Sequence, residues 1–79
     1  MHERRTIPRQ RIFKAGKIEF DGIAVECTVR NISETGAGLE IVSPVGIPHE
    51  ITLNILSRDV RYHGHVVWRQ KKRIGVAFN

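Results

Sequence analysis

Disulfide-forming cysteine pairs, targeting segments and membrane spans are missing from this sequence. Cys27 is the single cysteine, so no internal disulfide can form. No stretch resembles a signal sequence, with its charged, apolar and small-residue parts, and no apolar run is long enough to cross a membrane. These absences predict a cytoplasmic protein without membrane insertion.

Catalytic arrangements are missing too. The chain has 79 residues, enough for one small domain. A domain of this size buries only about 60% of the surface that its unfolded chain exposes, which leaves little room for a deep catalytic cleft. Ser33 has no histidine and acid near it in a recognisable catalytic pattern. We therefore expect no enzyme.

Metal-site spacing is also absent. His63 and His65 fall on one face of a predicted strand, and Cys27 and His49 are the other ligand types considered with them. No pair among them has the close spacing that a structural zinc site uses. We predict no metal site and histidines that face solvent.

Positive charge is abundant and unevenly placed. Thirteen Lys and Arg against eight Asp and Glu give a net charge of +5. The basic residues gather near both ends of the sequence. Residues 1–17 contain Arg4, Arg5, Arg9, Arg11, Lys14 and Lys17, and the stretch near the C-terminus contains Arg69, Lys71, Lys72 and Arg73. Such a surface attracts phosphate, whether in a nucleotide, a nucleic acid or a membrane. Any one of these residues is also explained as a solubilising charge.

Helical periodicity, repeats and low-complexity tracts are absent, and apolar residues instead alternate by twos. Ile23, Val25, Cys27 and Val29 alternate with polar or small residues, which predicts a strand with one buried face. Further strands are expected over residues 38–42, 51–56, 60–68 and 73–78, about six in all. Asp21-Gly22 is the strongest hairpin signal, because Asp-Gly tolerates the positive φ angles of a two-residue turn.

Short antiparallel strands in so small a chain favour an all-β fold closed into a barrel, which leaves no exposed sheet edge. The aromatic residues Trp68 and Phe78 are expected in the core or at the barrel rim. The predicted interior comprises these residues or their neighbours: Ile12, Ile18, Val25, Leu39, Leu53, Val66, Val76 and Phe78.

Two short polar motifs carry the functional signal. Arg5 and Arg9 stand four residues apart in the N-terminal arm, and a guanidinium fork binds phosphate oxygens or a guanine edge. Asn31, Ser33 and Gly36 offer an amide, a hydroxyl and a close backbone approach in a predicted turn. Without the arginines, ordinary turn chemistry explains the second motif equally well.

The first motif, Arg4 to Arg9, resembles the RxxxR arginine motif of PilZ domains, and Asn31 to Gly36 resembles that family's (D/N)xSxxG motif. The ending from Val66 to Phe78 is similar as well, so the resemblance covers nearly the whole chain. It implies a bacterial β-barrel receptor for the second messenger cyclic di-GMP, with no other cofactor. The ligand-binding residues that it implies are Arg4, Arg5, Arg9, Asn31, Ser33 and Gly36.

The resemblance also implies a mechanism. Residues 1–11 are expected to form a flexible basic arm and residues 12–79 the barrel, with the arm ordering over the ligand and exposing a new surface to a downstream protein. Two departures stand out. Asn31 lacks the charge of the Asp that many members carry, and the chain ends at Asn79, where many members continue into a C-terminal helix.

Two other functions remain open at this stage. One is a PilZ-like protein adaptor that binds no nucleotide. The other, less favoured, is a small basic barrel for single-stranded nucleic acid, a task that usually needs several exposed aromatic side chains. The sequence has only five aromatic residues, mostly at core-like positions. The oligomeric state is not predicted.

Overall fold

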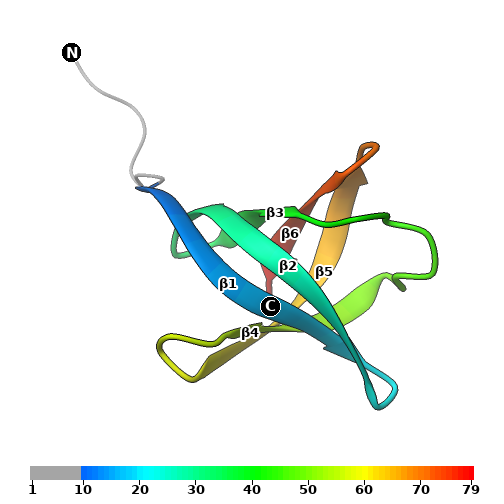
Figure 1. The fold of residues 1–79 in the computed structure, drawn as a ribbon, viewed down its shortest axis with the longest axis horizontal. Coiled ribbons are helices and arrows are strands. Elements are labelled where there is room, and N and C mark those ends of the chain that lie inside the picture. Colours follow the sequence, from blue (N-terminus) through cyan, green and yellow to red (C-terminus); the bar gives the residue numbers. More distant parts are fainter. Residues whose placement is uncertain (1–9) are drawn as a thin grey trace.

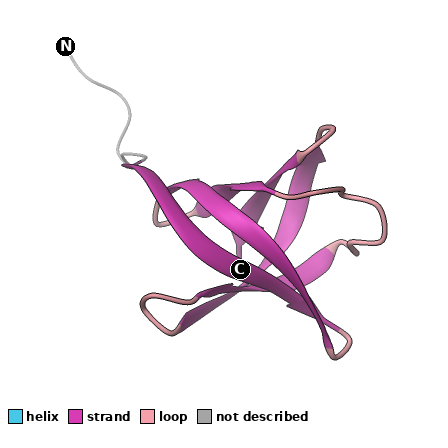
Figure 2. Cartoon of the chain, in the orientation of Figure 1, coloured by secondary structure: helices cyan, strands magenta, loops and turns pink. Residues whose placement is uncertain are grey.

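The computed structural model describes residues 10–79, and this part of the chain is all-β with no helix. Figures 1 and 2 show strands joined by short turns and by one longer loop between β3 and β4. The expected all-β class and the number of about six strands are confirmed. The strands are β1 (Gln10–Phe20), β2 (Ile23–Ile32), β3 (Gly36–Glu40), β4 (Glu50–Ile55), β5 (Val60–Arg69) and β6 (Arg73–Phe78).

The strands form a closed antiparallel barrel in the order β1-β2-β3-β6-β5-β4. Closure is made by β1, which pairs with β2 along most of its length and with β4 over Gly16–Glu19. The pairing of β3 with β6 brings together segments far apart in the sequence. The predicted barrel is therefore confirmed, and its outer wall runs continuously across β2, β3, β6 and β5 (Figure 1).

The β1–β2 hairpin turns at Asp21 and Gly22, as the sequence predicts. Phe20 pairs with Ile23, so the loop has two residues, and their φ angles are 49° and 77°. Positive φ at both positions matches the right-handed twist of the flanking strands and favours Asp-Gly. The turn therefore joins β1 to β2 with no unpaired residues other than Asp21 and Gly22.

The interior is filled by aliphatic side chains that alternate along the strands. Of the predicted core, Ile18, Leu39, Leu53, Val66 and Val76 are buried, and Ile12, Val25 and Phe78 are half-buried against them. Ile23 was expected on the buried face but is 52% exposed, because it lies beside the hairpin turn. Trp68 lies outside the core on the outer wall.

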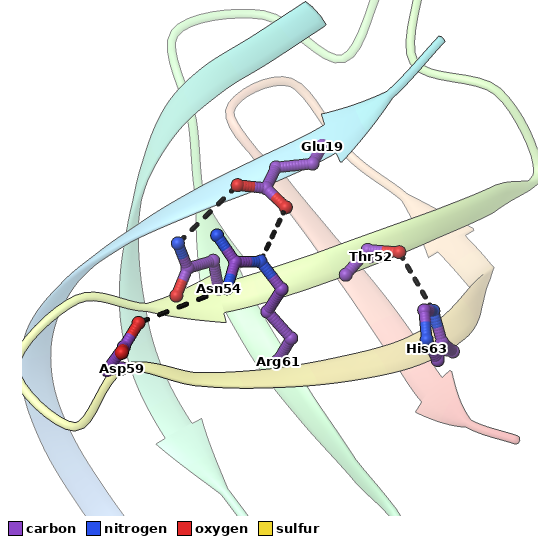
Figure 3. A network of polar contacts seen from close by, with 6 residues as sticks. All are labelled: Glu19, Thr52, Asn54, Asp59, Arg61 and His63. Carbon is purple, nitrogen blue, oxygen red and sulfur yellow. Dashed lines mark hydrogen bonds and ion pairs between the residues drawn. The ribbon is translucent and has the colours of Figure 1, made fainter. Parts of the chain in front are cut away.

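The outer face of β1, β4 and β5 carries a polar network (Figure 3). Glu19 accepts hydrogen bonds from Arg61 Nε at 3.1 Å and from Asn54 Nδ2 at 3.4 Å. Arg61 also lies 3.9 Å from Asp59. These contacts tie β1 to β4 and β5 where the barrel closes, on strands other than those that carry the Asn31 to Gly36 motif.

Residues 10–79 contain no helix of the length and hydropathy that a membrane crossing requires.

Candidate ligand-binding site

Asn31 lies inside β2, near its end, and not in the predicted turn. Its register partner is Gly38 in β3, and the Gly38 backbone N–H donates to Asn31 Oδ1 at 3.1 Å. Cross-strand pairing there outweighs the turn propensity that the sequence suggested. The Asn31 side chain is thereby held flat against the outer wall of the barrel.

Ser33 occupies the turn between β2 and β3. Its backbone N–H donates to the carbonyl of Gly36 at 2.8 Å, which closes the turn. Its hydroxyl lies 3.2 Å from the Thr35 hydroxyl and accepts from the Thr35 backbone N–H at 3.3 Å. The Ser33 hydroxyl therefore shapes the turn, and it remains half-exposed beside Asn31.

Gly36 begins β3, and its role is a close backbone approach. A Cβ atom built at Gly36 would overlap the carbonyl oxygen of Val76 in β6. Gly36 is not among the residues with positive φ. Of the two reasons that the sequence offered for a glycine here, close packing against the neighbouring strand is the one that applies within the barrel.

Four residues form a continuous row across four strands of the outer wall. Asn31 pairs with Gly38, Gly38 pairs with Gly75, and Gly75 pairs with Trp68. A Cβ at Gly38 would lie 2.9 Å from Asn31 Nδ2, and one at Gly75 would overlap the Trp68 indole. The two glycines thus form a flat floor, with the Asn31 amide lying over Gly38 and the Trp68 indole over Gly75.

This floor belongs to a pocket of about 130 Å³. Register shifts between Val29 and Asn31 in β2, and between Val66 and Trp68 in β5, mark the two sides of the pocket. Bulges of this kind re-aim side chains and are common beside binding sites. The pocket is lined by Arg30, Asn31, Ala37, Gly38, Leu39, Val67, Trp68, Arg73, Gly75 and Val76.

Arg30 forms the cationic edge of the pocket on the β2 side. Its Nη1 donates to Glu40 Oε1 at 2.8 Å, and its guanidinium carbon lies 4.9 Å from the centre of the Phe13 ring. The hydrogen bond from Arg30 is the main cause that lowers the pKa of Glu40, and the charges of Arg73 and Lys72 add to the effect. Glu40 is thus an ionised acid among cationic side chains.

Strand β1 begins beside this pocket. Gln10, where β1 begins, pairs with Ile32, and Arg11 pairs with Asn31. The chain therefore enters β1 directly next to the Asn31 to Gly36 motif. The predicted ligand residues Arg4, Arg5 and Arg9 lie outside the described residues 10–79.

His49, His63 and His65 lie on another part of the barrel. His63 is exposed and lies 3.0 Å from the Thr52 hydroxyl, whereas His65 is half-buried and contacts the Asn79 side chain at 2.9 Å. The rings of His49 and His65 have their centres 5.3 Å apart. Within residues 10–79 no group of three or more histidine, cysteine or acidic side chains is placed to hold a metal ion.

The described residues form a small β-barrel domain with a cationic, glycine-floored pocket on its outer wall. The family model described as the PilZ domain matches residues 3–79, so the chain belongs to the PilZ domain family. PilZ domains are non-catalytic receptor domains, and as a family they bind cyclic di-GMP. No curated protein matches the chain.

Sequence reasoning missed most of the pocket. Of the motif residues Asn31, Ser33 and Gly36, only Asn31 lines the pocket, and Arg30, Trp68 and the floor glycines were not predicted as site residues. These residues meet only through strand register and through the two bulges, which a single sequence does not reveal. The run of basic residues from Arg69 to Arg73 was the one available signal for Arg73.

Proposed function

We propose that this PilZ domain is a receptor for cyclic di-GMP and that the ligand lies on the outer wall between Asn31 and Trp68. The observation that carries the proposal is the row Asn31, Gly38, Gly75 and Trp68, which lies beside the start of β1. The family membership supports the same ligand.

The groups around the pocket suit a guanine nucleotide. Arg30 and Arg73 present guanidinium groups for phosphate oxygens or for the acceptor edge of guanine. Trp68 is 43% exposed and offers an indole face for stacking. The floor glycines let the Trp68 indole and the Asn31 amide lie flat against the wall, and that amide serves as donor and acceptor.

The arm arginines complete the proposed site. Arg9 directly precedes Gln10, whose register partner Ile32 follows Asn31 in β2, and Arg5 is four residues further away. In the proposed mechanism the arm closes over the bound ligand. Each charged hydrogen bond contributes ~1.5–3 kcal/mol, offset by about 1–2 kcal/mol for each arm residue that becomes ordered. Micromolar affinity is the expected result.

The signal in this proposal is the rearranged arm, which presents a new surface to a downstream protein partner in the bacterial cytoplasm. No chemistry on the ligand is involved. The domain acts by differential affinity, because the ligand stabilises the closed arrangement of the arm over the open one.

Titration calorimetry with cyclic di-GMP tests the proposal directly. We expect saturable binding at micromolar concentrations, and at least tenfold weaker binding of guanosine monophosphate, which lacks the second nucleotide. Asn31→Ala is the site variant. Thr52→Ala, in β4 and outside the pocket lining, is the control. Equal affinity of both variants, or no heat with the wild-type protein, contradicts the proposal.

One observation favours a second function, a protein adaptor that binds no nucleotide. An open groove of about 710 Å³ is lined in part by Phe13, Val42 and Leu56. These side chains are 70%, 86% and 45% exposed, and exposed apolar side chains gathered at one groove are typical of protein contacts. A null calorimetric result with cyclic di-GMP, together with a partner whose binding is lost in Phe13→Ser, supports the adaptor function instead.

A further inference from the structure

Arg30 connects two features of the surface. It lines the pocket, whereas its partner Glu40 lines the neighbouring groove, so their ion pair lies on the boundary between the two. The pocket lining contains two arginines and no acid. Any anion that enters the pocket therefore meets Arg30 and Arg73, with the Glu40 carboxylate immediately beside them.

We propose that Arg30 is a ligand-binding arginine supplied by the barrel wall and that Glu40 is its built-in competitor, which a phosphate of the ligand must displace. This inference rests on the proposed function, because it concerns the same pocket. It adds a phosphate-binding residue outside both sequence motifs and an acid that sets the affinity.

The geometry favours exchange over a permanent ion pair. The side chains of Arg30 and Glu40 are 31% and 44% exposed, so water screens their attraction and losing the contact costs little. A guanidinium group has five donors, and the described contact with Glu40 uses Nη1. A phosphate offers oxygen acceptors of the same kind as the carboxylate, and arginine binds both in a forked geometry.

Phe13 gives the Arg30 guanidinium a second contact that does not depend on Glu40. The centre of its ring, on β1, lies 4.9 Å from the guanidinium carbon of Arg30, and the ring lines the same groove as Glu40. This cation–π contact does not use the N–H donors at the edge of the guanidinium. Removing the charge of Glu40 therefore weakens its hold on the Arg30 donors without freeing the whole side chain.

Glu40 also acts on Arg73. The two residues are register partners across β3 and β6, and Arg73 is the second arginine of the pocket lining. A negative charge between two phosphate-binding groups repels the phosphate that both attract. The wild-type acid is therefore expected to keep the affinity below the value that the pocket would otherwise reach.

Glu40→Gln is the test, because glutamine keeps the size of the side chain and an oxygen that accepts from Arg30. In calorimetry with cyclic di-GMP at fixed ionic strength, we expect this variant to bind about three- to tenfold more tightly than wild type. Glu26→Gln, an exposed site in β2 that does not line the pocket, makes the same change in net charge and is the control. We expect its affinity to stay within about twofold of wild type.

The tighter binding of Glu40→Gln is expected to depend on Arg30. The double variant Arg30→Gln with Glu40→Gln is expected to lose the tighter binding and to fall below wild type. Unchanged or weaker binding by Glu40→Gln, or an equal gain from Glu26→Gln, overturns the inference.

A second measurement keeps this inference separate from the proposed function. Inorganic pyrophosphate is titrated into ¹⁵N-labelled protein, and the Arg30 Nε–Hε signal is followed by NMR. If no variant binds cyclic di-GMP, the proposed function fails, and this titration decides the anion subsite alone. A larger Arg30 shift in Glu40→Gln than in wild type supports the subsite, and no Arg30 shift in either protein overturns it.

Discussion

The Trp68 indole lies directly across Gly75, its register partner on β6, so closely that a Cβ at position 75 would overlap Nε1. The residue without a side chain is what lets the indole lie flat along the wall. Gly75→Ala is therefore expected to push the indole outward and to weaken cyclic di-GMP binding at least tenfold. Calorimetry measures the affinity, and a Gly46→Ala variant in the distant β3–β4 loop is the control.

Trp68 also provides an intrinsic probe, because it is the only tryptophan in the sequence. A base stacked on the indole is expected to quench its fluorescence, with a midpoint equal to the calorimetric dissociation constant. Trp68→Phe keeps an aromatic face and should retain most of the affinity, whereas Trp68→Ala should lose about 1–3 kcal/mol of binding free energy. Equal affinities of the two variants would show that the indole does not stack on the ligand.

Gly36 belongs to the Asn31 to Gly36 motif, and we also expect it to be needed for the stability of the barrel. Gly36→Ala forces a Cβ against the backbone carbonyl of Val76, which cannot move without disturbing the β3–β6 pairing. We expect a loss of about 1–3 kcal/mol in the free energy of unfolding, measured by urea denaturation. Gly22→Ala should cost less, since it meets only the strain of its positive φ and no neighbouring atom. The reverse order would contradict this explanation.

Arg5 and Arg9 are predicted to bind the ligand without contributing to the barrel. Arg5→Ala or Arg9→Ala should weaken cyclic di-GMP binding at least tenfold and leave the urea midpoint unchanged. Lysine should substitute poorly at either position, because it lacks the planar fork of donors. Unchanged affinity in both alanine variants would remove these arginines from the site.

Cys27 gives a pH dependence whose sign is fixed by its burial. The thiol is 8% exposed, and burial raises its pKa from 9.0 to about 12. Above pH 9 the unfolded chain releases this proton and the folded chain keeps it, so stability falls by about 1.4 kcal/mol per pH unit from this group. The loss begins at the unfolded pKa and ends at the folded one.

Urea denaturation of wild type and Cys27→Ala at pH 8 and pH 10 isolates this effect. The wild-type protein should lose more stability than the variant between the two pH values, because other titrating groups contribute equally to both. Parallel losses would contradict the assigned pKa. The folded protein should also react slowly with iodoacetamide, since the thiolate is the reactive form.

Much of the barrel could be predicted from the sequence, because its signals are local. The alternation along Ile23 to Val29 and the Asp21-Gly22 turn act within one hairpin, and both led to the correct elements. The pocket depends on register between strands such as β3 and β6, which are far apart in the chain. The bulge between Val66 and Trp68, which places Trp68 over Gly75, cannot be recognised from a single sequence.

The placement of Asn31 also could not be predicted from local sequence signals. Asn, Ser and Gly within six residues favoured a turn, but of Asn31, Ser33 and Gly36 only Ser33 lies between β2 and β3. Pairing with Gly38 keeps Asn31 in β2, where the Gly38 backbone N–H donates to the Asn31 side-chain oxygen, a contact that local propensity does not include.

An NMR titration of ¹⁵N-labelled protein with cyclic di-GMP shows whether the arm arginines and the outer-wall pocket form one binding site. We expect the signals of residues 4–9, of Asn31 to Gly36 and of the Trp68 indole to shift together, with a single dissociation constant. Shifts confined to the arm, with the Asn31 and Trp68 signals unmoved at saturating ligand, would contradict a single shared site.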